Sequence, residues 1–282
     1  MEYLYTFHVA GFFILPFFYQ NNDHVSWDKI GKIVVRSWIP YLWVCLLCWT
    51  VFSLYQHHFE FGWGHVFAFA NGTQSPIRQY FGFVFPWFLP TYCSMSLLLM
   101  FARRWRWIGL LGFTLGLGTF LMSWEQFYQF KNTISLGLGL ALHFFTSGVI
   151  AFYSNKLSVI CKYIGGILFV ALSICWWCAV PIGILFQLMP ASFFLFLLCL
   201  VPYINFPFLQ FVGRYSLGIY LFHVFIINIL ERILPHETAW GWVVFAISLL
   251  GALMITYIIY QNKKVRTVLF PKSWDELRSI FK

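Results

Sequence analysis

The apolar stretch Phe211–Ile227, which reads FVGRYSLGIYLFHVFII, contains polar side chains at positions that suit proton-transfer chemistry. If the stretch is helical, Ser216, Tyr220 and His223 follow i, i+4 and i+7 spacing, so their side chains share one face. Polar groups deep in hydrocarbon are costly unless they face protein or a wet cavity. A neutral imidazole can accept a proton near neutral pH, so this face is a candidate site.

Two further histidines, His8 and His143, also lie in apolar stretches. For each of the three histidines one interpretation is a packed imidazole that is hydrogen-bonded to a nearby carbonyl or hydroxyl, and the other is a functional base. We favour the packed imidazole for His143, in LALHFFTSG, while both interpretations stay open for His8 and His223. No Asp lies in an apolar span, which excludes a Ser-His-Asp triad within the hydrocarbon.

The sequence gives little support to a metal or redox centre. His57, His58 and Glu60 form a small cluster in QHHFEF, for which we favour a solvated loop over a metal or glycan site. The 7 cysteines lie in or beside apolar spans without an accompanying ligand pattern, which is typical of small buried hydrophobic side chains. We therefore expect no metal ion and no bound cofactor.

The composition indicates an all-α, polytopic membrane protein with about nine transmembrane helices. The 282 residues are 61% hydrophobic and only 10% charged, whereas soluble domains are roughly 45–50% apolar and about 25% charged. We expect one membrane domain in residues 1–260 and a basic amphipathic tail in residues 261–282, with Ser273 as a helix N-cap. The apolar spans are Leu4–Tyr19, Ile39–Gln56, Phe81–Phe101, Trp107–Met122, Ile134–Tyr153, Ile164–Leu188, Ala191–Phe206, Tyr215–Glu231 and Trp240–Tyr260.

The net charge of +9 reflects membrane topology rather than binding to nucleic acid. Fifteen of the 18 Lys and Arg residues fall in loops or the tail on one side of the predicted bundle, and three fall on the other. The positive-inside rule places the fifteen in the cytoplasm, and the C-terminus with them. With nine spans the N-terminus then lies outside, and one apolar helix upstream of Met1 would restore an even number of spans.

Some of the predicted cytoplasmic cations have a second interpretation. Arg36 and the cluster of Arg103, Arg104 and Arg106 could bind an anionic cytosolic substrate through charge-assisted hydrogen bonds to phosphate. For most of these cations we favour a role in topology alone. Arg36 is better placed, because VVRSWIPY sets it one turn before Pro40 at the start of a span.

Several stretches, in the expected order, resemble the acyltransferase 3 family of integral membrane O-acyltransferases, which acetylate sugars of surface polysaccharides. FHVAGFFILPFFY around His8 is similar to the second-helix motif of the family, with Val9 and Ala10 in place of the usual Met-Pro. KIGKIVVRSWIPYLWV resembles the basic run into the next helix, with Arg36 and Pro40 at the motif positions.

Two later stretches strengthen the resemblance. FPWFLPTYCSMSLL is similar to the Trp-Phe-Leu segment of the family through Trp87, Phe88 and Leu89. The best match is GRYSLGIYLFHVFIIN, whose matching positions are Gly213, Ser216, Leu217, Tyr220, Leu221 and His223.

The resemblance implies an enzyme of about ten membrane helices in the bacterial inner membrane, at the cell envelope. It would move an acetyl group from acetyl-CoA, or another acyl group from acyl-CoA, to a hydroxyl of a cell-surface or lipid-linked glycan, with membrane lipids around it and no nucleic acid partner. From the intramembrane histidines, the inner cations and the motif matches together, we expect catalysis by His8 and His223, donor binding by Arg36, Arg103 and Arg104, and acceptor binding by Trp87, Ser216 and Tyr220.

Two alternatives stay open. The family pattern opens with a helix that carries an Arg or Lys and, a few turns later, a His that is regarded as catalytic. This sequence begins at the second-helix motif. The additional helix that an even number of spans would require is thus the same helix that carries the first motif of the family. One alternative is therefore a truncated or inactive member of the family. The other is an export component for a polysaccharide or lipid-linked sugar, since some family members carry that label.

Overall fold

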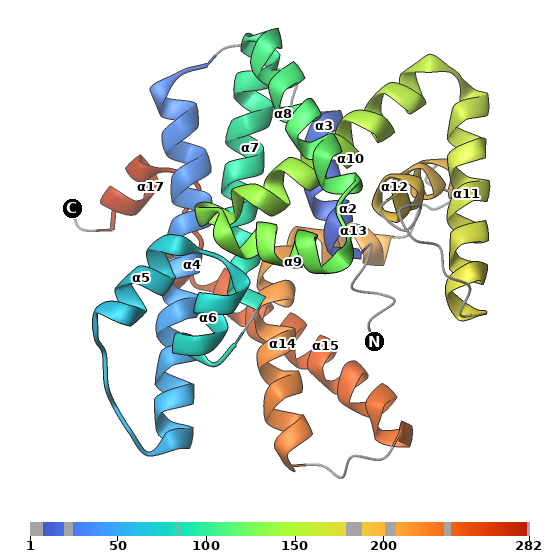
Figure 1. The fold of residues 1–282 in the computed structure, drawn as a ribbon. Helices are drawn as coiled ribbons and strands as arrows, with labels where there is room; N and C mark the ends of the chain where they lie inside the picture. The colour runs from blue at the N-terminus through green and yellow to red at the C-terminus, as the bar shows by residue number, and fades with distance from the viewer. Residues whose placement is uncertain are drawn as a thin grey trace.

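The computed structural model describes residues 8–19, 25–83, 85–178, 188–200, 207–233 and 238–280. Within these ranges the chain is helical and has no β-strand, which confirms the predicted all-α class. The elements, shown in Figure 1, are α2 (His8–Ile14), α3 (Pro16–Tyr19), α4 (Trp27–Gln56), α5 (Trp63–Asn71), α6 (Gln74–Phe81), η1 (Phe85–Trp87), α7 (Phe88–Arg104), α8 (Arg106–Phe120), α9 (Trp124–Thr133), η2 (Ser135–Gly137), α10 (Leu138–Leu157), α11 (Val159–Trp177), α12 (Met189–Leu200), α13 (Pro207–Arg214), α14 (Ser216–Ile233), α15 (Thr238–Gln261), α16 (Lys263–Leu269) and α17 (Trp274–Arg278).

Each of the nine predicted apolar spans falls on described helix for at least part of its length. The remainders of these spans that fall in residues 4–7, 179–187 and 201–206 lie outside the described residues. Among the described residues, 5 helical segments are long and apolar enough to cross a membrane, and two shorter apolar helices, Met189–Leu200 and Ser216–Leu230, accompany them. The 5 segments are Trp27–Gln56, Phe85–Arg104, Ser135–Leu157, Val159–Trp177 and Val243–Gln261.

Two helix boundaries differ from the predicted spans for identifiable reasons. Helix α4 begins at Trp27, well before the apolar run, because the Ser26 side chain accepts a hydrogen bond from the Lys29 backbone N–H and caps the helix. The first predicted span is broken into α2 and α3 at Leu15. Pro16 is the first residue of α3, where its missing N–H is harmless, whereas inside a helix it would leave a carbonyl unpaired.

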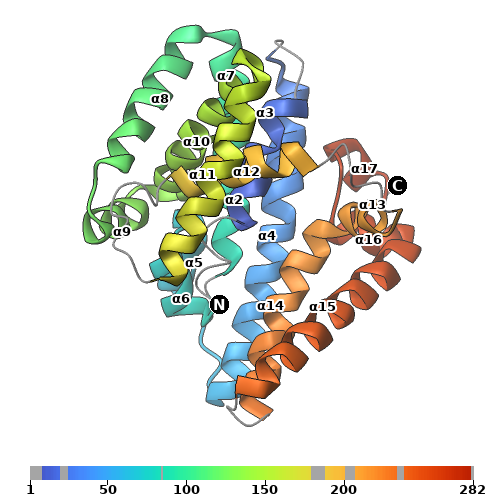
Figure 2. The same cartoon turned by 90° about the vertical axis from the view of Figure 1, so that its right-hand side faces the viewer.

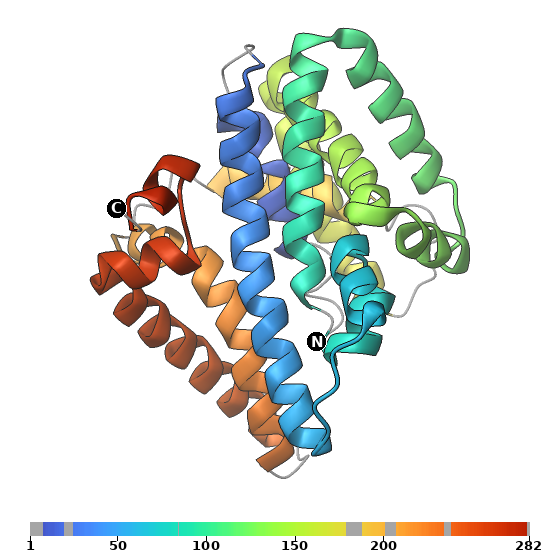
Figure 3. The same ribbon diagram turned by 90° about the vertical axis from the view of Figure 1, so that its left-hand side faces the viewer.

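The helices form a bundle whose basic ends lie together. Helices α4 and α7 run side by side in opposite directions (Figure 3). The start of α4, the end of α7 and the junction of α10 with α11 all lie at the upper end of the molecule in Figure 1. The last turn of α7 contains Arg103 and Arg104, and the last turn of α10 contains Lys156. The structure therefore gathers on one side three basic segments that the charge pattern had grouped.

An aromatic core joins α2, α7 and α10. Phe13 is completely buried, and its ring stacks on Phe144 with the ring centroids 4.4 Å apart. The same ring lies 4.9 Å from the ring of Phe88, centroid to centroid. Large rings bury much apolar surface at little loss of side-chain entropy, so this contact fixes the short α2 against the two long helices.

Helices α8 and α10 approach closely at Gly116. A Cβ atom added at Gly116 would overlap the Leu142 carbonyl and the Thr146 hydroxyl, both on α10. Small residues are common where membrane helices touch, because they allow the backbones to come together. Gly118, two residues further along α8, has open space at the same position.

We predict that Gly116→Ala destabilises the protein by about 1–3 kcal/mol, because the added methyl group overlaps rigid backbone. Gly118→Ala is the matched control, and it should raise stability slightly, by up to about 1 kcal/mol, since alanine has the higher helix propensity. Thermal unfolding of the two variants in the same detergent checks this prediction. Equal midpoints would contradict the close contact between α8 and α10.

Candidate functional site

A cavity of about 470 Å³ lies where α2, α4, α7, α14 and the segment after α15 meet. We call it the central cavity. Its wall is rich in aromatic side chains and contains three cationic ones. The lining residues are Phe12, Leu15, Pro16, Arg36, Phe88, Leu89, Tyr92, Ser216, Leu217, Tyr220, Tyr260, Arg266, Phe270, Pro271 and Lys272.

Three of the predicted site residues, Arg36, Ser216 and Tyr220, line the central cavity together. They come from α4 and α14, which are far apart in sequence. Ser216 and Tyr220 lie one turn apart on α14, as the i, i+4 spacing predicted, and Arg36 lies across from them on α4. One cation and two hydroxyl groups that the sequence singled out as site residues therefore lie in the wall of the same cavity.

Tyr220 is held rigidly in the cavity wall. Its hydroxyl group donates a hydrogen bond to the Phe85 carbonyl, with 3.4 Å between the oxygens. Its ring packs on Phe88, with the centroids 4.4 Å apart, and on Phe12 from α2. A buried tyrosine with a satisfied hydroxyl group presents one ring face at a fixed place, which is what a binding surface for a planar or sugar-like ligand requires.

His223 lies one turn beyond Tyr220 on α14 and is half-buried. It does not line the central cavity itself, and its ring centroid is 5.9 Å from that of Tyr220. Its Nδ1 lies 2.9 Å from the Ile219 carbonyl oxygen. A carbonyl only accepts hydrogen bonds, so this contact requires the proton on Nδ1. Nε2 is then the basic nitrogen of the neutral imidazole.

The other predicted catalytic residue, His8, is the first residue of α2. The placement of its side chain lies outside the described part of the structure. Phe12, one turn later in the same helix, lines the central cavity. The backbone of α2 thus passes the cavity, while the role of His8 stays a prediction.

Three predicted binding residues lie outside the wall of the central cavity. Trp87 belongs to η1 and stacks on Phe13 in the aromatic core, with the centroids 6.3 Å apart. Arg103 donates a hydrogen bond to the Phe17 carbonyl at 2.8 Å, which holds α3 to the end of α7. Arg104 is exposed at the end of α7. Trp87 and Arg103 therefore make contacts that hold helices together, away from the wall of the central cavity.

Sequence reasoning missed four lining residues in the C-terminal tail, which we define as residues 262–280. Arg266, Phe270, Pro271 and Lys272 all line the central cavity. The basic charge and the apolar face of the tail are typical of an anchor on the inner membrane surface, so the sequence alone predicts an anchor rather than part of a cavity wall. In the sequence, Phe270 and Pro271 are apolar residues beside the cations of the tail, which suits a buried segment. They do not indicate which helix the tail would contact.

The Glu276 carboxylate and the Lys272 carbonyl link the segments that carry the three cationic residues of the cavity. The Arg36 Nε–H donates to the Lys272 carbonyl at 3.0 Å. The Glu276 carboxylate pairs with Arg266 through one oxygen and accepts the Lys272 backbone N–H at 2.7 Å through the other. Burial acts to raise the pKa of Glu276, but the hydrogen bonds from Lys272 and Arg266 outweigh it and hold that pKa below its usual value.

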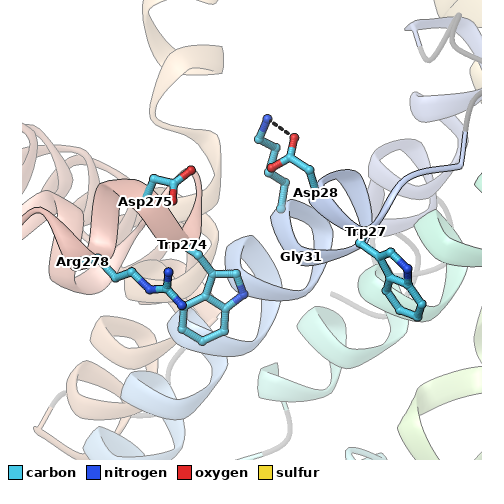
Figure 4. Close-up of a pocket in the computed structure, with 7 residues that line it drawn as sticks. Trp27, Asp28, Gly31, Trp274, Asp275 and Arg278 are labelled. Atoms are coloured by element: carbon cyan, nitrogen blue, oxygen red, sulfur yellow. Dashed lines mark hydrogen bonds and ion pairs between the residues drawn. The ribbon is translucent and has the colours of Figure 1, made fainter.

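The tail docks on α4 through further contacts. The Trp43 indole N–H donates to the Val268 carbonyl at 3.0 Å. The Ser273 side chain accepts a hydrogen bond from the Glu276 backbone N–H at 3.2 Å and caps α17, which confirms the predicted N-cap. The indole of Trp274 lies beside Gly31 of α4 (Figure 4), where an added Cβ would come within 3.3 Å of the ring.

The remaining candidates from the sequence form no second site among the described residues. His143 is buried, with Nδ1 2.9 Å from the Thr119 hydroxyl oxygen and its ring stacked on Phe120, which agrees with the packed imidazole. His58 lies 3.6 Å from a Glu60 carboxylate oxygen on an exposed loop. No group of three or more potential metal ligands occurs in the described ranges, and their cysteines are free thiols.

These features define a class of protein. It is an all-α integral membrane protein with a cavity whose wall combines aromatic rings, two hydroxyl groups on one helix and a cluster of cations. The chain belongs to the acyltransferase 3 family, because the family model, described as an acyltransferase domain, matches residues 1–261. It is therefore a membrane acyltransferase in general terms. No curated protein and no solved structure matches the chain.

We predict that the docking of the tail depends on pH through Glu276. The folded-state pKa of Glu276 is lowered, so its stabilising contribution is present above the pKa of the unfolded state, about 4.3. That contribution is lost as the pH falls through the folded-state value. Hydrogen–deuterium exchange of peptides from residues 263–280, corrected for the intrinsic rate, should therefore accelerate in acid.

Glu276→Gln serves as the matched variant for this measurement. It should exchange faster than the wild type already at pH 7 and lose the acid-dependent step. Peptides from the buried middle of α10 are the internal control and should keep their protection. An acid-dependent step that persists in Glu276→Gln would assign the effect to another group.

Proposed function

We propose that this membrane acyltransferase moves an acetyl group from acetyl-CoA to a hydroxyl of a cell-surface or lipid-linked glycan. Membership of the acyltransferase 3 family supplies the general reaction. The observation that carries the finer proposal is the composition of the central cavity. It combines cations suited to phosphate with aromatic rings suited to a sugar, and Ser216 and Tyr220 lie in the same wall.

The donor end of the cavity is proposed to be Arg36. This residue is exposed on α4, lines the cavity and carries donors beyond the Nε–H that bonds to Lys272. A guanidinium group has five N–H donors and suits the oxygens of a phosphate. The contact of Arg103 with the Phe17 carbonyl favours Arg36 over the Arg103–Arg106 cluster for the phosphate groups of acyl-CoA.

The acceptor would lie along the aromatic wall. The ring faces of Tyr220 and Phe88, and the Ser216 hydroxyl, offer stacking and hydrogen bonds of the kind that position a sugar. The tight packing of Trp87 against Phe13 leaves it a supporting role behind this wall. Orientation of the acceptor hydroxyl beside the thioester lowers the barrier because the reactants need no further alignment.

The proposed chemistry is a single acyl transfer with general-base assistance. The acceptor oxygen forms a bond to the thioester carbonyl carbon as a histidine takes its proton. The carbon–sulfur bond then breaks, and the thiolate of CoA leaves and regains a proton. The contact of His223 Nδ1 with the Ile219 carbonyl supports this residue, since it leaves Nε2 basic. His8 remains the other candidate base.

We further propose that the protein resides in the bacterial inner membrane with its C-terminus in the cytoplasm. The support is the charge pattern, with fifteen of 18 Lys and Arg residues on the predicted inner side. The gathering of the ends of α4, α7 and α10 on one side of the bundle is in keeping with this orientation (Figure 1). Acyl-CoA would then reach the cavity from the cytosol.

We predict that removal of the general base lowers acetyl transfer about 10²–10⁴-fold, the typical range for such a loss. At least one of His223→Ala and His8→Ala should show this loss, and the variant that does identifies the base. Membranes containing the protein are supplied with labelled acetyl-CoA and a glycan acceptor, and the labelled glycan is measured. His58→Ala, on the exposed loop, is the matched control and should keep wild-type activity.

Full activity in both His223→Ala and His8→Ala would remove these assignments. Movement of glycan across the membrane without any label would instead favour an export component. The absence of both label and movement, with the protein folded, would favour an inactive member of the family.

A further inference from the structure

The C-terminal tail lies beyond the part of the chain that the family model matches. That match ends at residue 261, whereas four tail residues line the central cavity. The arrangement of the tail can be followed in Figure 2, where α16 follows the end of α15, and both α16 and α17 contact α4. A segment outside the family domain thus contributes wall to the cavity inside it.

The tail is a built part of this wall. Thr267, Phe270 and Pro271 are buried, and the Phe270 ring lies 6.0 Å from that of Tyr260, centroid to centroid. Backbone carbonyls at Val268 and Lys272 accept side-chain hydrogen bonds from α4. These contacts fix the backbone of the tail against α4, so the fold defines where the backbone of each cationic residue lies.

We propose that the tail completes a binding site for the phosphate groups of an organic anion, formed by Arg266 and Lys272 of the tail together with Arg36 of α4. Glu276 is a positioning residue, because it holds the Arg266 side chain and the Lys272 backbone at once. This inference deepens the proposed function and rests on it in naming acyl-CoA as the physiological ligand.

The charges of the cluster favour an anion. Arg36, Arg266 and Lys272 contribute three positive charges to the cavity, and Glu276, which pairs with Arg266, contributes one negative charge beside it. The guanidinium groups retain N–H donors beyond those that hold the tail in place. Phosphate esters carry the charge and the oxygen geometry that such a cluster binds through charge-assisted hydrogen bonds.

Lys272 offers the sharpest test, because its structural contacts use its backbone. Its N–H bonds to Glu276 and its carbonyl accepts from Arg36, while the residue as a whole is exposed and belongs to the lining of the cavity. Lys272→Gln therefore removes the ammonium group, with its electrostatic attraction to Glu276, and leaves the backbone hydrogen bonds that dock the tail. Lys264→Gln is the matched control, since Lys264 is an exposed lysine of the same tail that does not line the cavity.

The measurement is the affinity of the full chain for CoA in nanodiscs of phosphatidylcholine. We expect Lys272→Gln and Arg266→Gln to weaken CoA binding about 10- to 100-fold, the loss expected for a charge-assisted hydrogen bond. Lys264→Gln should bind like the wild type. Pantetheine, which lacks the phosphates, should bind equally to all of these proteins. Equal CoA affinity in Lys272→Gln and Lys264→Gln would overturn CoA as the ligand of this site.

Arg266→Gln also breaks the pair with Glu276, so Glu276→Gln is measured beside it. A positioning role predicts that Glu276→Gln weakens CoA binding less than Arg266→Gln and that higher salt does not restore it. If Glu276→Gln and Arg266→Gln weaken CoA and pantetheine alike, the tail acts on the cavity as a whole and the phosphate site is overturned.

A headgroup of an anionic lipid carries the same phosphate chemistry as CoA. A second set of nanodiscs, made with phosphatidylglycerol, separates the two sources by thermal stabilisation. If the wild type binds no CoA, but phosphatidylglycerol stabilises it and Lys272→Gln loses that effect, the phosphate site stands with a lipid as its ligand. Failure of both ligands to distinguish Lys272→Gln from Lys264→Gln overturns it.

These outcomes separate the site from the proposed function. Loss of CoA binding in Lys272→Gln, in a protein that transfers no acetyl group to glycan, would support the site and contradict the proposed reaction. Acetyl transfer that is unchanged by Lys272→Gln at low acetyl-CoA would support the reaction and contradict the site.

Discussion

The absence of water among apolar helices is the constraint on which this structure depends. A polar side chain in such a place must find its hydrogen-bond partner within the protein, because none is available from the surroundings. Around the central cavity that partner is repeatedly a backbone carbonyl. Tyr220 donates to the Phe85 carbonyl, and the His223 Nδ1 contacts the Ile219 carbonyl. Arg36, which is exposed, also donates to a backbone carbonyl, that of Lys272. Each bond fixes the direction of a side chain that can interact with a ligand.

The same constraint explains how helices of ordinary apolar composition acquire defined positions. Lipid tails are as apolar as Leu or Phe, so hydrophobicity alone does not order one helix against another. Order comes from the close approach of α8 to α10 at Gly116 and from the stacked rings of Phe13 and Phe144. The short helix α2, which ends at Ile14 before the break at Leu15, is held at the cavity by these rings.

The sequence predicted the fold class and part of the site because these depend on local patterns. The apolar runs are long and uninterrupted, so the helices were evident, and the i, i+4 spacing correctly placed Ser216 and Tyr220 on one face. Arg36 was identified because it lies one turn before Pro40. The roles of all the predicted site residues, Arg36, Ser216 and Tyr220 included, remain predictions. The structure gives Trp87 and Arg103 contacts away from the cavity. The docking of the tail could not be predicted, since the contact of Arg36 with Lys272 joins residues 236 positions apart.

The order in which the chain is made gives the tail a role during biogenesis. Arg36 enters the membrane region with an early helix, while its carbonyl partner follows the last long helix, α15. Until that late segment emerges, the guanidinium group has only water or lipid headgroups to bond with. The wall of the cavity is therefore complete only after the residues that follow α15 have been made and have docked on α4.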